Sequence, residues 1–239
     1  MGSDDLFRKR KARLSEESAR RKANRKPYDK VLIVCEGSKT EPIYFEELRI
    51  HEELDSANVT VDGKCGSSPI SVVNHAKKLF DKDLAKNEVY NKVFCVFDRD
   101  THTTFDDAVE EVDKINSDIA KNEQIAKMEL DEEVEFVAIK SDPSFEYWLL
   151  LHFNPTTKPY RTLPNKSVGD QVIDDLKVFL PEYKKTQKGI YVQSIDLNTL
   201  DGALSNSERI FKAAERSQNF NPSTNIHILI NYLRDLKSA

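Results

Sequence analysis

The run Val31-Leu32-Ile33-Val34-Cys35, followed at once by Glu36, decides the fold of this chain. Five apolar and mostly β-branched residues in succession are typical of a strand that is buried on both faces. Such strands occur in parallel sheets, because the crossover helices cover both sides of the sheet. The run therefore predicts an α/β protein whose folded part begins near residue 30.

Strand and helix patterns alternate along the rest of the chain. Pro42 and Pro69 are placed to open helices, since proline is tolerated in the first helical turn. We expect strands at 31–35, 58–61, 92–97 and 134–139, and helices at 42–54, 69–85, 104–122, 143–153, 168–180, 198–217 and 224–237. The one further candidate strand is 190–192. This order predicts a mainly parallel sheet flanked by helices, with a helical C-terminal extension.

The composition excludes several classes of protein. Hydrophobic residues make up 38% and charged residues 32% of the 239 residues. No apolar run approaches the roughly 20 residues of a membrane span, and the basic N-terminus lacks the apolar segment of a signal peptide. Cys35, Cys65 and Cys95 form no CxxC pair, so neither a disulfide framework nor a zinc ribbon is indicated. We expect a cytoplasmic protein without a membrane partner.

The net charge of −5 conceals an uneven distribution along the chain. Residues 1–30 carry 11 Lys and Arg against 5 Asp and Glu, whereas the remaining residues carry 25 against 36. We therefore expect a basic arm at 1–29, flexible or helical, an α/β core at 30–155, and a helical region at 156–239 packed on the core. The arm is either a solubilising tail or a surface for nucleic-acid phosphates or an acidic partner.

Acidic residues follow three of the predicted strands directly. Glu36 follows the first strand, Asp98 and Asp100 follow the third, and Asp142 and Glu146 follow the fourth. Parallel strands deliver their carboxyl ends to one edge of the sheet, where ligands bind in open α/β folds. The side-chain period of two in an extended chain points Asp98 and Asp100 the same way. We expect carboxylates from three strand ends to converge.

Converging carboxylates repel one another unless they are protonated or neutralised. Mg²⁺ and Mn²⁺ are hard ions that prefer oxygen ligands, so a metal site is the expected solution. Such ions can bind phosphate oxygens and activate water for phosphodiester cleavage. Each acid also has a simpler reading as a turn former, and Asp142 before Pro143 either caps the next helix or joins the metal shell. Arg99, between the two aspartates, is expected to form a structural ion pair.

The turn after the first strand is not a phosphate-binding P-loop. Gly37-Ser38-Lys39-Thr40 looks like the end of one, but a P-loop needs Gly directly before the Lys-Ser/Thr pair and another Gly five residues earlier. Ser38 and Ile33 occupy those two positions. The chain should therefore not hydrolyse ATP by that route.

Four motifs of the chain together resemble the RloB-like family. They are VLIVCEGSKTEPIYF at 31–45, FDRD at 97–100, DPSFEYWLLLHF at 142–153, and NPST at 221–224 with His227. The resemblance extends from about 27 to 237, and it is the combination that is specific, since each motif alone is not. That family commonly has Asn before the proline of the third motif, where this chain has Asp142.

The resemblance implies a Toprim-like domain, as in topoisomerases, primases and OLD-family nucleases, and hence a Toprim/Rossmann-like sheet. By this resemblance Glu36, Asp98 and Asp100 match positions that hold Mg²⁺, or Mn²⁺ in its place. Glu41, one residue beyond the usual spacing, and Glu146 match acids that complete a second metal site. Glu36 is assigned in such domains either as a ligand or as a general acid or base.

The resemblance also implies a lysine that assists the transition state, for which Lys185 is the candidate and Lys184 and Lys188 are rivals. Basic residues outside the metal site are candidates for contact with nucleic acid or a partner. These are Arg8, Lys9, Arg10, Arg20, Arg21, Lys39, Lys184 and Lys188.

The function predicted in this way is metal-dependent cleavage of phosphodiester bonds. The resemblance implies a toxin-like effector of a phage-defence system that works with a separate ABC-type ATPase. It favours RNA over DNA, with tRNA as the first candidate, although the chain alone does not distinguish them. The alternative is a Toprim-fold regulatory subunit that binds nucleotide or nucleic acid without cleaving it. A homodimer is left open as a further assembly.

Overall fold

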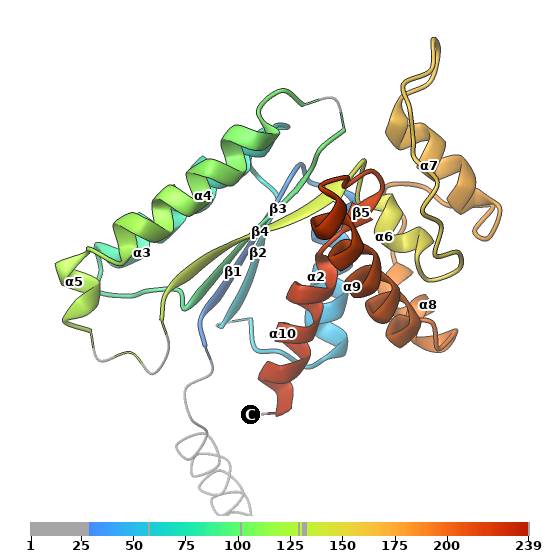
Figure 1. Ribbon diagram of the computed structural model, residues 1–239. Helices are drawn as coiled ribbons and strands as arrows, with labels where there is room; N and C mark the ends of the chain where they lie inside the picture. Colours follow the sequence, from blue (N-terminus) through green and yellow to red (C-terminus); the bar gives the residue numbers. More distant parts are fainter. Residues whose placement is uncertain (1–28, 57, 101, 129, 131–132, 239) are drawn as a thin grey trace, which may run out of the picture.

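The computed structural model describes residues 29–56, 58–100, 102–128, 130 and 133–238. Within them, one five-stranded sheet has the strand order β2-β1-β3-β4-β5 (Figure 1). The strands are β1 (Val31–Cys35), β2 (Val59–Asp62), β3 (Lys92–Asp98), β4 (Glu135–Asp142) and β5 (Ser223–Thr224). The first four are parallel, whereas β5 runs antiparallel to β4. The predicted α/β fold with a mainly parallel sheet and a helical C-terminal region is confirmed.

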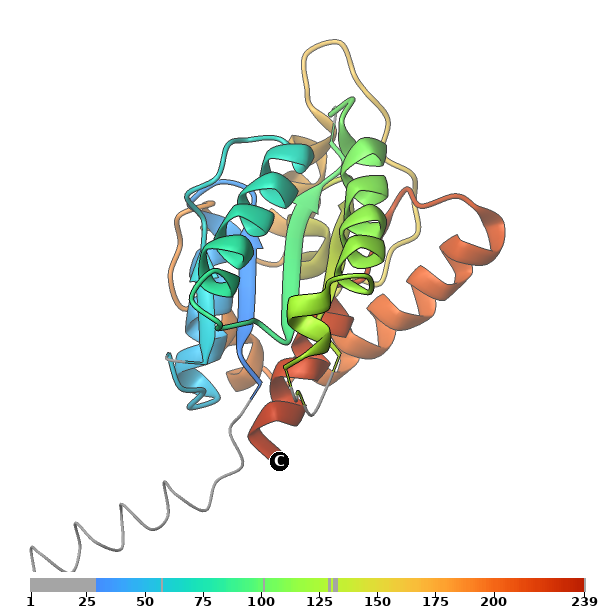
Figure 2. The same ribbon diagram turned by 90° about the vertical axis from the view of Figure 1, so that its left-hand side faces the viewer.

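Helices cover both faces of the sheet, as the buried run of β1 requires. Leu32 and Val34 face one hydrophobic cluster, and Ile33 and Cys35 face the other, because successive strand residues point to opposite sides. Figures 1 and 2 show α3 (Pro69–Leu84) and α4 (Phe105–Ile119) side by side on the first face, with the short α5 (Glu123–Ala126) beside them. The second face carries α2 (Thr40–His51), α6 (Glu146–Leu150), α7 (Val168–Lys177), α8 (Ile190–Asp196), α9 (Leu200–Ser217) and α10 (Ile226–Ser238).

The hydrophobic cluster on the second face joins residues from distant parts of the sequence. Ile33 of β1 and Tyr44 of α2 belong to the same cluster as Leu229 and Leu233 of α10. The helices after residue 156 thus pack on the sheet and on α2. The division of the chain into domains near residue 155 stays a prediction.

The register of the ladders fixes which residues meet at the end of the sheet. Cys35 pairs with Val96, and the Glu36 N–H donates to the Val96 carbonyl at 3.0 Å. Asp98 pairs with Ser141 near the end of β4. The residues that follow β1, β3 and β4 therefore emerge together at one edge, at the upper end of the strands in Figure 1.

Three local features in the second half of the chain differ from what the sequence suggested. Residues 190–192 begin helix α8 instead of a strand, because the Glu47 carboxylate of α2 accepts hydrogen bonds from the Gly189 and Tyr191 N–H groups at the start of that helix. The two-residue strand β5 was not expected. Helix α6 begins at Glu146, so Asp142 is the last residue of β4 and caps no helix.

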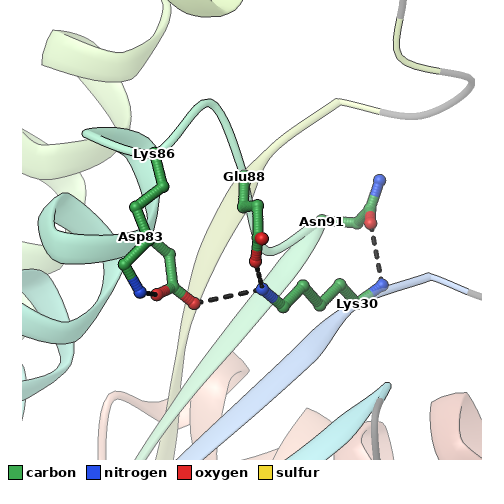
Figure 3. A network of polar contacts seen from close by, with 5 residues as sticks. All are labelled: Lys30, Asp83, Lys86, Glu88 and Asn91. Atoms are coloured by element: carbon green, nitrogen blue, oxygen red, sulfur yellow. Dashed lines mark hydrogen bonds and ion pairs between the residues drawn. The ribbon is translucent and has the colours of Figure 1, made fainter.

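A polar network holds the beginning of β1 in place (Figure 3). The Lys30 ammonium lies 3.1 Å from Asp83 Oδ2 and 2.8 Å from Glu88 Oε2. The Lys30 backbone N–H donates to Asn91 Oδ1 at 2.8 Å, and the Asn91 N–H donates back to the Lys30 carbonyl at 2.7 Å. These contacts join the residue before β1 to the end of α3 and to the segment before β3. They thereby help to hold β1 and β3 in register.

No helix among the described residues combines the length and the apolar character that a bilayer crossing needs. The predicted basic arm lies almost entirely outside the described residues, and with it Arg8, Lys9, Arg10, Arg20 and Arg21.

His152 should make the stability of the fold depend on pH. Burial lowers the pKa of His152 to about 4, compared with about 6.5 in an unfolded chain. Below pH 6.5 the unfolded chain therefore binds a proton that the folded chain does not, and stability is lost as the pH falls, by about 2 kcal/mol at pH 5. Urea unfolding at pH 7 and pH 5 should show a smaller loss for His152→Gln than for the unaltered protein. Equal losses in the two proteins would contradict this role.

Candidate functional site

A cavity of about 360 Å³ opens where the residues following β1 and β3 meet the start of α6. We call it the acidic cavity. Its carboxylates are those of Glu36, Glu41, Asp98, Asp100, Glu146 and Asp170. Lys39, Lys185 and His102 also line it. Acidic side chains from several elements therefore surround one small space.

Glu36 is fixed by contacts on both carboxylate oxygens. The Asp98 backbone N–H donates to Glu36 Oε2 at 3.3 Å, and His102 Nε2 lies 3.1 Å from Glu36 Oε1. Burial raises the pKa of Glu36, while the Asp98 amide and His102 act in the opposite direction. The end of β1 and the turn after β3 are thus joined through one carboxylate.

Glu146 is buried at the first turn of α6, with only 2% of its surface exposed. The Ser144 hydroxyl donates to Oε2 at 2.8 Å, and the Tyr183 hydroxyl donates to Oε1 at 3.2 Å. Lys185 Nζ lies 3.5 Å from the same Oε1. A buried carboxylate needs such partners, since burial without them is costly.

Among the described residues, Glu41 and Asp98 have backbone N–H partners but not the side-chain donors that hold Glu146, and their pKa values are raised. Burial, opposed by its own backbone N–H and reinforced by the charges of Glu146 and Glu36, raises the pKa of Glu41 to about 8. Burial followed by the charges of Glu41 and Glu146 raises the pKa of Asp98 well above its usual range. The cavity has more carboxylates than its own cations neutralise, so these two acids tend to stay protonated unless a cation is bound.

Lys185 is the cation that enters this group of acids most directly. Burial alone would lower its pKa, but Glu146, Asp98 and Glu41 outweigh that effect, so that the pKa is raised. The Thr40 hydroxyl donates to the Lys185 carbonyl at 3.1 Å and ties the lysine's loop to the start of α2. Its side chain is still 54% exposed, which leaves the ammonium accessible to a ligand.

The turn after β3 sends neighbouring side chains to opposite sides. Asp98 and Asp100 line the acidic cavity, whereas the Arg99 guanidinium lies 2.7 Å from Asp106 and 3.8 Å from Asp142. Backbone hydrogen bonds from Arg99 to Ser141 and from Asp100 to Pro143 hold the turn against the end of β4. Asp100 has a φ of +33°, a conformation that is uncommon for a residue other than glycine and that recurs at functional sites.

The donor chemistry of the acidic cavity suits Mg²⁺ or Mn²⁺, which take oxygen ligands. Within the described residues, however, no three His, Cys, Asp or Glu side chains form a group that could by itself hold a metal ion. Mg²⁺ is often held by one or two carboxylates, with water and substrate phosphate completing its shell. The described residues that line the cavity fit that open kind of site and do not form a cage of protein ligands.

The five residues predicted as metal ligands, Glu36, Glu41, Asp98, Asp100 and Glu146, all line this cavity, and so does Lys185. Lys39 lines it as well, whereas Lys184 and Lys188 are exposed and do not. Sequence reasoning missed His102, which has no metal-ligand spacing to another His or Cys. Its position four residues after Asp98 could have suggested a partner for Glu36. Tyr183 and Ser144 gave no pattern that would have revealed them.

A family model described as RloB-like protein matches residues 31–233. The chain belongs to the RloB-like family. All four motifs on which the RloB-like resemblance depends fall inside the matched residues, while the basic residues of the arm precede them. Searches of the curated proteins and of the solved structures gave no match to this RloB-like chain.

Removal of the Glu41 carboxylate should stabilise the protein in the absence of divalent cations. Glu41→Gln keeps the shape of the side chain and removes an acid whose pKa is raised to about 8 by burial and by the charges of Glu146 and Glu36, so at pH 7 we expect a gain of about 1–3 kcal/mol in the free energy of unfolding. Glu47→Gln on the same helix is the matched control, and it should lose stability because Glu47 accepts the N–H groups of Gly189 and Tyr191. Thermal unfolding in EDTA measures both. A loss of stability in Glu41→Gln would show that the folded state does not raise the pKa of Glu41 as described.

Proposed function

We propose that this RloB-like protein is a metal-dependent nuclease that cleaves phosphodiester bonds at the acidic cavity. The observation that carries the proposal is the meeting of Glu36, Asp98 and Asp100 in one cavity beside Lys185. Acids at adjacent strand ends with a nearby exposed lysine are suited to a phosphate ligand only when a cation offsets their charge. Mg²⁺ or Mn²⁺, when bound, supplies that charge and lowers the pKa of a coordinated water.

In this reaction the side chains of the protein would hold the acids in place and stabilise negative charge on the phosphate. Lys185 can reach from Glu146 to a phosphate oxygen and stabilise the negative charge that develops there. His102 and the Asp98 amide hold the Glu36 carboxylate in one orientation from two sides. Ser144 and Tyr183 do the same for Glu146, so the acids are placed before a substrate arrives.

The loop before α7 supports a nucleic acid as the substrate. Residues 154–167 contain Lys158, Arg161 and Lys166 and no acidic residue. The loop is anchored at Tyr160, whose N–H donates to Asn221 Oδ1 at 2.9 Å, and it descends to Ser167 at the wall of the acidic cavity. Figure 1 shows it projecting above the sheet edge, where its cations could follow a phosphate backbone toward the site.

We extend the proposal to the biological setting on the strength of the family alone. The protein would be the toxin-like effector of a phage-defence system, acting in the cytoplasm with a separate ABC-type ATPase. RNA, and tRNA first among RNAs, is the favoured substrate over DNA. The basic arm offers a further surface for nucleic acid or the ATPase, and a homodimer stays open as an assembly.

One observation favours the alternative of a regulatory subunit that binds without cleaving. The described residues include no ready group of three metal-binding side chains. A site of this kind could hold a metal-bound nucleotide or nucleic acid and do no chemistry.

Cleavage assays separate the two functions. The purified protein, with and without its ATPase, should cleave tRNA, single-stranded or duplex DNA with Mg²⁺ or Mn²⁺ present, and EDTA should abolish cleavage. Asp98→Asn and Glu36→Gln should each reduce the rate by about 10³-fold or more, and Lys185→Met by about 10²-fold, the scale of a lost electrostatic contact. Asp118→Asn, an exposed carboxylate of α4, is the matched control. Full activity in both acid variants would rule out this site.

The loop should contribute to affinity through charge alone. Replacement of Lys158 and Arg161 by Ala should weaken binding of a fluorescent oligonucleotide regardless of its sequence. It should also reduce the slope of log affinity against log salt concentration by about 2. Lys121 and Lys127, two exposed lysines near α5, provide the control double variant. An unchanged slope in the loop variant would show that the loop does not contact phosphates.

A further inference from the structure

A second cavity lies on the other side of the turn after β3. It has a volume of about 270 Å³, and its walls include the rings of Phe105, Phe211 and Phe220. Its charged groups are the cations Arg99 and Lys140 and the carboxylates of Asp106, Glu110 and Asp142. We call it the aromatic cavity. The chemistry proposed for the acidic cavity makes no use of it.

The two cavities share a wall made of two turns. Arg99 lines the aromatic cavity, while Asp98 and Asp100 on either side of it line the acidic cavity. In the same way Asp142 lines the aromatic cavity, and Ser144, two residues later, lines the acidic one. The Arg99 N–H donates to the Ser141 carbonyl at 2.8 Å, which fastens the two turns together. A ligand at the strand ends is therefore next to both cavities.

Cationic groups lie over aromatic rings in this cavity. The Arg99 guanidinium is 4.5 Å from the centre of the Phe105 ring. Lys140 Nζ lies 5.8 Å from the centre of Phe211 and 5.9 Å from that of Phe220. Within the described part of the chain no carboxylate forms an ion pair with Lys140, and burial lowers its pKa. The ammonium is thus partly desolvated and has its hydrogen-bonding capacity free for a ligand.

These features match the recognition of one nucleobase. Bases stack on aromatic rings and on guanidinium planes, and their edges carry both donors and acceptors. Lys140 offers a donor to such an edge, and the carboxylates of Asp142 and Glu110 offer acceptors. Arg99 already donates to Asp106 at 2.7 Å, so its part is to lie over the Phe105 ring. The volume is slightly below the range of about 300–1,000 Å³ that is typical of pockets for drug-sized ligands, which suits a single base.

We propose that the aromatic cavity binds an unpaired nucleobase of the nucleic acid whose phosphate backbone lies at the acidic cavity. A base inside a duplex cannot enter such a pocket without leaving the stack, so the substrate is single-stranded or looped at this point. This inference rests on the proposed function only in requiring that nucleic acid binds at the strand ends. It does not require that the protein cleaves it.

The test measures binding with Ca²⁺ in place of Mg²⁺, so that a divalent cation offsets the acids. A short fluorescent single-stranded oligonucleotide is compared with an analogue of the same length that has only abasic sites, by fluorescence anisotropy, and a gel confirms that both strands stay intact. The full protein should bind the oligonucleotide with bases about tenfold more tightly than the abasic strand, the scale of one stacked base.

Two variants locate that preference in the aromatic cavity. Phe220→Ala removes a stacking ring, and Val109→Phe fills the space from α4. Both should bring the ratio of the two affinities to within about twofold of one, since the stacking contribution is lost, while affinity for the abasic strand stays unchanged. If Phe220→Ala lowers the melting temperature, its loss of binding could reflect unfolding. Val109→Phe then still tests the cavity, because it fills the space without removing a ring. Phe179→Ala, which removes an exposed ring stacked on Phe153, is the control and should keep the full ratio.

A base preference that persists in both cavity variants would overturn the inference, as would equal affinity of the unaltered protein for the two strands. Asp98→Asn should keep the preference for bases even if it is inactive in cleavage. Failure of the nuclease proposal would therefore appear as absent cleavage with the base preference intact, and failure of this inference as cleavage without that preference.

Discussion

Hydrogen bonding between the parallel strands β1, β3 and β4 is the constraint on which the rest of the structure depends. Because Cys35 pairs with Val96 and Asp98 pairs with Ser141, the three strands end within reach of one another. A shift of one residue in either ladder would turn Asp98 to the opposite face, since strand side chains alternate. The position of the acids is therefore a property of the sheet and only secondarily of the helices that follow.

The grouping of buried acids at the edge of the sheet is electrostatically unfavourable. Burial and neighbouring acids raise the pKa values of Glu41 and Asp98, while Lys185 is the cation placed among them with a direct ion pair to Glu146. Proteins tend to keep such unfavourable groupings at functional sites. The nuclease proposal accounts for the cost, because a cation and a phosphate would use the same carboxylates and the same lysine. A purely structural role for six acids in one cavity offers no such compensation.

The sheet and the acids at its edge could be predicted from the sequence, but the contacts that hold those acids could not. The buried run at 31–35 predicts the parallel sheet, and the chain direction predicts that the acids after its strands meet at one edge. Glu41 and Lys185 followed only from the family resemblance, and Asp170 was not predicted. The partner of Glu146 could not be foreseen, since Tyr183 reaches it across 37 residues. A short apolar run such as 190–192 fits a strand or a helix equally, and the contacts with Glu47 on α2 that hold the helix cannot be read from the run itself. His102 was missed because its partner is a carboxylate on another strand end.

Asp98 and Asp100 line the acidic cavity, and Arg99 between them lines the aromatic cavity, so one turn separates two cavities of different chemistry. The proposed function depends on binding of a divalent cation by the carboxylates of the acidic cavity. The most direct measurement is a titration of the protein with Mn²⁺ followed by electron paramagnetic resonance. The account predicts saturable binding in the unaltered protein and in Asp118→Asn, and its loss in Asp98→Asn. The same binding in all three proteins would contradict the account.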